Sequence, residues 1–254
     1  MANFTKMKTK TLTNPLFITS EYLEQYLSIF DDEMEETEPK KSLQNSIEII
    51  DIYGPITKRD GWWSCGSETY ASILDAIYRN TQIKGVILKV DSGGGEFGGI
   101  APVYEMIAKR NKPVVAFVDG MAASACYGMI CNADMIVAAR NTDRVGSIGA
   151  YCTIQDFTGY FEKMGIKIID VYSSKSKDKN LPYREAVKGN TNLMQNEIDF
   201  LVNDFISKVK TSRHPNSDDW QTGKLYYAQD ALSIGLIDAI DSLDNVIKYF
   251  ENEI

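Results

Sequence analysis

Short apolar runs alternate with amphipathic segments along most of this chain. The runs are rich in Val and Ile, and they predict strands at residues 47–53, 85–90, 113–118, 135–139 and 167–172. Apolar positions at helical spacing predict helices at residues 68–78, 97–110, 122–132, 156–164, 192–209, 228–233 and 243–250. Because strands alternate with helices, we expect an α/β fold with parallel sheets and helices on both faces.

The first 45 residues follow a different pattern. Apolar positions at residues 21–30 predict one short amphipathic helix, and the acidic run at residues 31–38 is typical of a solvated linker. A covering arm or a partner-docking segment is the alternative. We therefore divide the chain into an N-terminal arm or linker at residues 1–45 and one domain at residues 46–254.

Composition excludes several classes of protein. The formal net charge of −8, with no basic face, argues against nucleic-acid binding. The apolar runs are too short to cross a bilayer, and no signal core follows the N-terminus, so we expect a cytoplasmic protein without a membrane anchor. One histidine and no C-x-x-C spacing argue against a metal site, and the four cysteines are expected to be free, buried thiols.

Two turns carry the candidate chemistry. Asp91-Ser-Gly-Gly-Gly95 follows one predicted strand, and Gly120-Met-Ala-Ala-Ser124 follows the next. Glycine lets a backbone N–H approach a substrate closely, and a serine can form an acyl-enzyme. Taken alone, the glycines could be a tight turn and Ser124 a helix N-cap. No G-K-[ST] follows the glycines, which excludes a P-loop.

A serine hydroxyl needs a base. The only histidine, His214, precedes Pro215 in a polar stretch, so we do not expect a Ser-His-Asp triad. A neutral lysine can serve if its pKa falls by about three units from about 10.4. Composition does not choose among Lys175, Lys177 and Lys179, and a surface lysine cluster is the alternative.

Six motifs together resemble the signal peptide peptidase A family of serine–lysine peptidases. The resemblance extends over about residues 47–240, and its motifs lie at residues 91–95, 122–127, 133–138, 146–149, 177–184 and 228–238. It implies the spiral of ββα units that the family shares with the Clp protease proteolytic subunit and the crotonases.

The resemblance also implies roles for single residues. Ser124 is the nucleophile, Lys177 is the general base, and Ser147 holds the lysine amine toward Ser124. The oxyanion hole is formed by backbone N–H groups, from Gly94 or Gly95 and from Ala125. Lys177 is chosen because it stands five residues before Pro182, as the family's pattern requires.

The expected function is a serine endopeptidase that uses no metal or cofactor and cleaves extended peptides. Relatives form rings or domes, so a homo-oligomer is expected. A phage capsid-maturation protease, in the host cytoplasm or the assembling virion, and a soluble bacterial peptidase both fit. Two alternatives remain: an inactive assembly or scaffolding protein with this fold, and a crotonase-like acyl-CoA enzyme.

Overall fold

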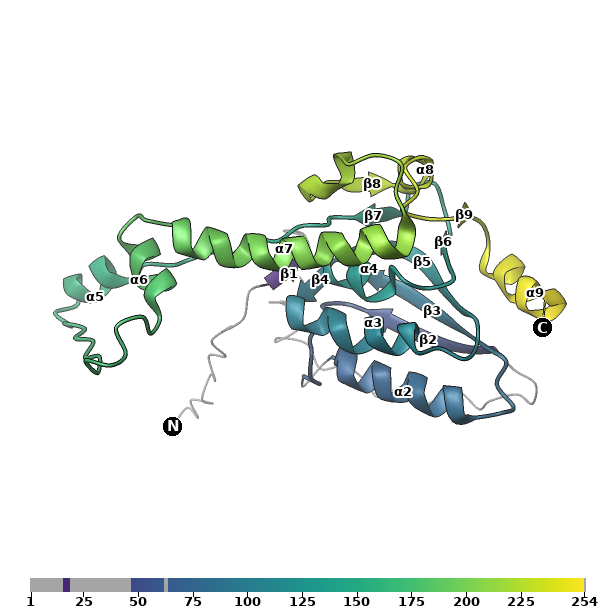
Figure 1. The fold of residues 1–254 in the computed structure, drawn as a ribbon, viewed down its shortest axis with the longest axis horizontal. Coiled ribbons are helices and arrows are strands. Elements are labelled where there is room, and N and C mark those ends of the chain that lie inside the picture. The colour runs from purple at the N-terminus through teal and green to yellow at the C-terminus, as the bar shows by residue number, and fades with distance from the viewer. Residues whose placement is uncertain (1–15, 19–46, 62–63, 254) are drawn as a thin grey trace, which may run out of the picture.

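A parallel sheet forms the centre of the molecule (Figure 1). The computed structural model describes residues 16–18, 47–61 and 64–253. Five parallel strands lie in one path, in the order β2 (Ile47–Tyr53), β3 (Gly85–Ser92), β5 (Val114–Ala123), β6 (Met135–Ala138) and β9 (Ala239–Ile240). The predicted α/β class with a mainly parallel sheet is confirmed.

Strand β5 pairs with two different strands, one after the other, along one of its edges. Its first half pairs with β6, and Met121–Ala123 pairs with β7 (Arg144–Gly146). The β7 strand in turn pairs antiparallel with β8 (Leu225–Tyr227). The end of β5 is therefore held between β3 and β7, which fixes the residue that follows it.

Helices cover both faces of the sheet, as predicted. Strand β3 shows the division, because Val86, Leu88 and Val90 join one core cluster while Ile87 joins the other. One face is covered by α2 (Ser67–Arg79), α3 (Ile100–Ala108), α4 (Ala125–Ile130), α8 (Ala228–Ser233) and the end of α7 (Asn192–Arg213). The other face is covered by α9 (Leu243–Glu253).

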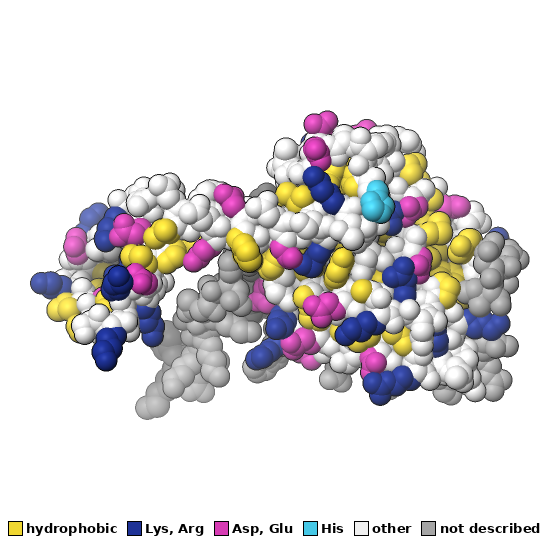
Figure 2. Space-filling view, viewed as in Figure 1, with side chains coloured by type: hydrophobic (Ala, Val, Ile, Leu, Met, Phe, Trp, Pro, Cys, Tyr) yellow, Lys and Arg dark blue, Asp and Glu magenta, His cyan; other side chains and the backbone are white. Residues whose placement is uncertain are grey.

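Residues 149–204 form an extension from this body. Figure 1 shows α5 (Thr158–Lys163) and α6 (Leu181–Val187) beyond the sheet, joined to it by the first part of α7. No side chain in this stretch is buried. Figure 2 shows apolar side chains on the surface of the extension.

The predicted strand at residues 167–172 is wrong. This segment lies in the extension and has no strand partner among the described residues. Ile169 and Val171 are 71% and 89% exposed. The apolar run has the composition of a strand, but it lies in the extension beyond the sheet and pairs with none of the described strands.

Several element boundaries also differ from prediction. The helix expected at residues 122–132 begins only at Ala125, because β5 continues through Ala123. The helix expected at residues 97–110 is a 3-10 turn, η1 (Phe97–Gly99), followed by α3, and η2 (Asp219–Thr222) is a further turn. The helix predicted at residues 21–30 lies outside the described residues.

A small second sheet was not predicted. It pairs β1 (Leu16–Ile18) antiparallel with β4 (Gly94–Glu96), directly after the glycine turn. Of the helices that the structure describes, none joins the length and the apolar character that crossing a bilayer would require.

Candidate active site

Ser124 stands at the sharp turn between β5 and α4. Its backbone has φ 53° and ψ −123°, a conformation that a residue with a side chain rarely adopts. Such a conformation costs on the order of 1–3 kcal/mol and persists only where the surroundings hold it. The Ser124 N–H donates to the Gly146 carbonyl at 2.8 Å, and its own carbonyl accepts from Gly128 N–H at 2.9 Å. Ser124 is 2% exposed, so this strained turn is fixed inside the packed body.

Ser147 lies beside Ser124. The two strands that precede them are paired with Ala123 opposite Gly146, so each serine is the next residue along its strand. Ser147 also has positive φ, 52°, and its N–H donates to the Lys224 carbonyl at 2.8 Å. The structure therefore brings together two of the predicted site residues, and only Ser124 is buried.

The glycine turn lies on the other side of β5. Ser92 pairs with Ala122, two residues before Ser124, and Gly94 follows with φ 102°. The Ser92 hydroxyl donates to the Gly54 carbonyl at 2.5 Å and accepts from Gly94 N–H at 3.1 Å. A buried serine thus orients the N–H group that was predicted to stabilise an oxyanion.

Glycine is the only residue type that the position of Gly95 permits. A Cβ there would lie 2.0 Å from the Ile56 carbonyl oxygen. The bridge to Ile56 holds the glycine strand against the body through two hydrogen bonds, from Ile56 N–H to the Gly94 carbonyl and from Glu96 N–H to the Ile56 carbonyl, both 2.8 Å. Ala125 opens α4, so its N–H has no partner within the helix.

Cys126 is the rival nucleophile nearest to Ser124 in sequence. It is fully buried, and burial raises the pKa of its thiol to about 12. The neutral thiol is a poor nucleophile. All four cysteines are free, as expected, but burial is confirmed only for Cys126 and Cys131; Cys65 is exposed and Cys152 is half-buried.

His214 does not take part in this site. It is exposed and ends α7 with φ 48°. Within the part of the chain that the structure describes, no cluster of His, Cys, Asp and Glu could hold a metal ion.

Lys177 lies in the extension, between α5 and α6, and its side chain is exposed. Its backbone carbonyl accepts from Arg184 Nη2 at 2.5 Å, and the same guanidinium lies 4.4 Å from the centre of the Tyr172 ring. Arg184 therefore fixes the backbone at Lys177 while the amine is left on the surface. Lys175 and Lys179 are also exposed.

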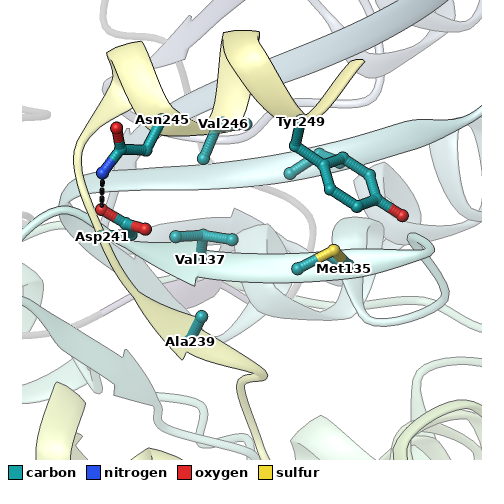
Figure 3. A pocket seen from close by; sticks show the side chains of 8 residues that line it. Met135, Val137, Ala239, Asp241, Asn245, Val246 and Tyr249 are labelled. Carbon is teal, nitrogen blue, oxygen red and sulfur yellow. Dashed lines mark hydrogen bonds between the residues drawn. The ribbon is translucent and has the colours of Figure 1, made fainter. Parts of the chain in front are cut away.

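A small cavity of about 120 Å³ lies between α9 and the sheet (Figure 3). Its walls are apolar except at one rim, where Asn245 Nδ2 donates to Asp241 Oδ1 at 2.7 Å. None of the predicted site residues lines it, so it reflects packing beneath α9 rather than a substrate site.

One protein-family model matches more than half of the chain. The family model described as "Peptidase family S49" matches residues 107–254, which include Ser124, Ser147 and Lys177. The chain belongs to peptidase family S49.

Curated relatives agree with this family. The "Putative protease MJ0651" of Methanocaldococcus jannaschii is 33% identical over 72% of this chain and 60% of its own length. The "Protease 4" of Haemophilus influenzae is 28% identical over 90% of this chain and 37% of its own length. The "Head-tail preconnector protein GP5" of Enterobacteria phage P21 is 24% identical over 80% of this chain and 42% of its own length. This S49 chain thus spans between about a third and three fifths of the length of these relatives.

Two features of the site were missed from the sequence. Ser92 belongs to the glycine motif, but no role was predicted for it; it is two residues beyond Val90 in β3, and this alternation was the signal for a buried hydroxyl. The β1 strand was also missed; the apolar triplet Leu16-Phe17-Ile18 after Pro15 was its only signal.

Proposed function

We propose that this protein is a serine endopeptidase in which Ser124 is the nucleophile. The observation that carries the proposal is the strained backbone of Ser124, held in a buried turn between β5 and α4. A turn of this kind presents a side chain in front of the N-terminus of the following helix and leaves the next backbone N–H to stabilise negative charge. Membership of peptidase family S49 supports the same assignment.

The proposed reaction proceeds through an acyl-enzyme. Lys177 accepts the hydroxyl proton as Ser124 Oγ forms a bond to the substrate carbonyl carbon. The negative oxygen is stabilised by the N–H of Gly94 or Gly95, which exchanges its present partner for the substrate, and by the N–H of Ala125. The C–N bond then breaks, and Lys177 returns the proton to the leaving amine. Water, deprotonated by the same lysine, attacks the ester carbonyl; the bond from the carbonyl carbon to Ser124 Oγ breaks, and the lysine returns the proton to the serine oxygen.

We propose that the lysine reaches the serine of a second copy of the chain. Ser124 is buried in the body, whereas Lys177 lies in an extension without a single buried side chain. Its exposed apolar residues include Ile168, Ile169 and Phe200, which are 58%, 71% and 74% exposed. Such a surface would be covered in a homo-oligomer, and Ser147 at the edge of the site would then receive the amine.

The substrates we propose are peptide segments in extended conformation. The phage relative is named a head–tail preconnector protein, and this supports phage capsid maturation as one setting for the reaction. The protease relatives support a more general peptidase role equally well.

The test is complementation between two inactive variants. Ser124→Ala and Lys177→Ala, each purified alone, should both lose cleavage of a fluorogenic peptide mixture while keeping the wild-type circular dichroism spectrum. Unfolded and refolded together in equal amounts, they should regain activity at about a quarter of the sites, where an intact serine meets an intact lysine from another copy.

Each result bears on a separate part of the proposal. Activity retained by Ser124→Ala would remove Ser124 as nucleophile. If the mixture stays inactive although an affinity-tagged copy of one variant co-purifies the other, the lysine acts within its own chain. A wild-type protein that cleaves no peptide would favour the scaffolding alternative.

A further inference from the structure

The outer edge of β4 is occupied by the chain's own N-terminal segment. Leu16 lies opposite Glu96, Phe17 opposite Gly95 and Ile18 opposite Gly94. The inner edge of β4 is already bonded to Ile56 through the Gly94 carbonyl and the Glu96 N–H. Because hydrogen-bonding groups alternate along a strand, the N–H and carbonyl of Gly95 face β1. Gly95, the second glycine predicted for the oxyanion hole, therefore pairs with Phe17 of β1. Figure 1 shows the strands β1 and β4 next to each other.

Strand β1 runs along β4 in the direction that a bound substrate peptide would take. Gly94 is the end of β4 nearer to the serine turn, because Ser92 pairs with Ala122 just before Ser124. The antiparallel β1 runs toward this end, with Ile18 opposite Gly94. A peptide to be cleaved would lie in the same way, with the residues before its attacked carbonyl along β4 and the carbonyl itself at Gly94.

We infer that Leu16–Ile18 is a tethered competitor for the outer edge of β4, the edge along which an extended substrate would pair under the proposed function. The inference rests on the proposed function for the role of Ser124, but the pairing itself does not depend on it. The competitor's sequence, Leu-Phe-Ile, indicates the substrate class: segments with apolar, strand-forming residues before the cleaved bond.

Tethering makes a weak strand an effective competitor. A segment joined by a short or moderate linker is present at an effective concentration in the millimolar range. Strand β1 has only three residues, so it can exchange with a longer peptide that pairs along the whole edge. The N-terminal arm would thus lower the apparent affinity for substrate without blocking the site permanently.

Two proline variants separate pairing from other effects. The Phe17 N–H faces Gly95, so Phe17→Pro removes a donor from the pair and should release β1. The Leu16 N–H points away from β4, so Leu16→Pro in the same triplet should leave the pairing in place. Both variants are made in the full chain, so no separately folded fragment is needed.

The first measurement is binding, in a Ser124→Ala background where no peptide is cleaved. The probe is a fluorescein-labelled peptide of residues 12–21 of this chain, followed by anisotropy. The Phe17→Pro protein should bind it about tenfold more tightly than the Leu16→Pro protein or the otherwise unaltered chain. A peptide with proline at the position of Phe17 should bind none of them. Equal affinity of the three proteins would overturn the inference, as would equal binding of the two peptides.

The second measurement is turnover, with Ser124 intact. Phe17→Pro should lower the KM for an apolar fluorogenic peptide about tenfold and leave kcat unchanged, while Leu16→Pro should change neither. A change in kcat alone would contradict competition. If no variant cleaves any peptide but the binding difference is present, the proposed function fails and the assignment of the β4 edge stands.

Discussion

The two halves of the proposed dyad lie in regions that differ in almost every physical respect. Ser124 is buried in a turn that is fixed by three neighbouring strands, and its backbone is strained. Lys177 is exposed in a stretch of 56 residues, 149–204, in which no side chain is buried. The comparison teaches that the body holds the proposed nucleophile in a buried, fixed turn, whereas the proposed base lies in an extension whose side chains are not buried.

The largest expected effect concerns which lysine acts. Lys177→Ala should lower kcat/KM for a peptide substrate by about 10²–10⁴-fold, the contribution of a positioned general base. Its melting temperature should not change, because the side chain is exposed. The matched variants Lys175→Ala and Lys179→Ala, also exposed, should stay within about twofold of wild type. Loss of activity in Lys175→Ala instead would shift the assigned base by two residues.

The second prediction compares the body and the extension along α7, because this helix begins in the extension and ends against the body. Phe205 of α7 is fully buried, and a Cβ on Gly128 of α4 would lie 3.0 Å from its ring. Phe205→Ala should reduce the free energy of unfolding by about 3–5 kcal/mol. Phe200, in the same helix but 74% exposed, should change it by less than about 0.5 kcal/mol when replaced by alanine. Urea denaturation followed by tryptophan fluorescence measures both, and equal losses would contradict the division of α7.

The smallest effect concerns charge. Asp119 of β5 is 27% exposed and accepts from Arg140 at 2.6 Å, with Lys89 at 3.1 Å. The hydrogen bond from Lys89 is the main reason that the pKa of this carboxyl lies below its usual value of 3.8. A lowered carboxyl pKa stabilises the fold above the unfolded value, and this stability is lost as the pH falls through the folded value.

Asp119→Asn should therefore cost about 1 kcal/mol near neutral pH, and the difference from wild type should disappear as the pH falls below about 3.8. Glu185 in the extension makes a comparable exposed pair with Lys188 at 2.8 Å. The hydrogen bond from Lys188 also lowers the pKa of the Glu185 carboxyl, so Glu185→Gln should give a loss of the same sign but a smaller one, because Glu185 has one ion pair where Asp119 has two. A difference that persists in acid would show that Asp119 acts by packing instead.

The sequence predicted most of the body because its strands and helices carry their own periodicity. Residues 47–53, 85–92 and 135–138 are strands that the apolar pattern located to within about two residues. The strand predicted at residues 167–172 failed because composition alone does not show whether a sheet edge is available. Strands β1, β4 and β7 are only three residues each, too short for periodicity to detect.

For the site, the motifs identified Ser124, Ser147 and the glycine turn, and the strand register brings these together. No sequence pattern shows that the Gly94 N–H donates to the Ser92 hydroxyl, because that contact depends on the geometry of the turn. The distance between lysine and serine could not be predicted either, since it depends on how the extension folds. The role of Lys177 stays a prediction.

The left-handed backbone at Ser124 has a consequence for how this position can change. Glycine is the residue that would relax such a φ angle at no steric cost, and it would also delete the hydroxyl. Folding stability alone therefore favours a substitution that would remove the proposed nucleophile. Under the proposed function, the hydroxyl of Ser124 is retained against the conformational preference of the backbone that carries it.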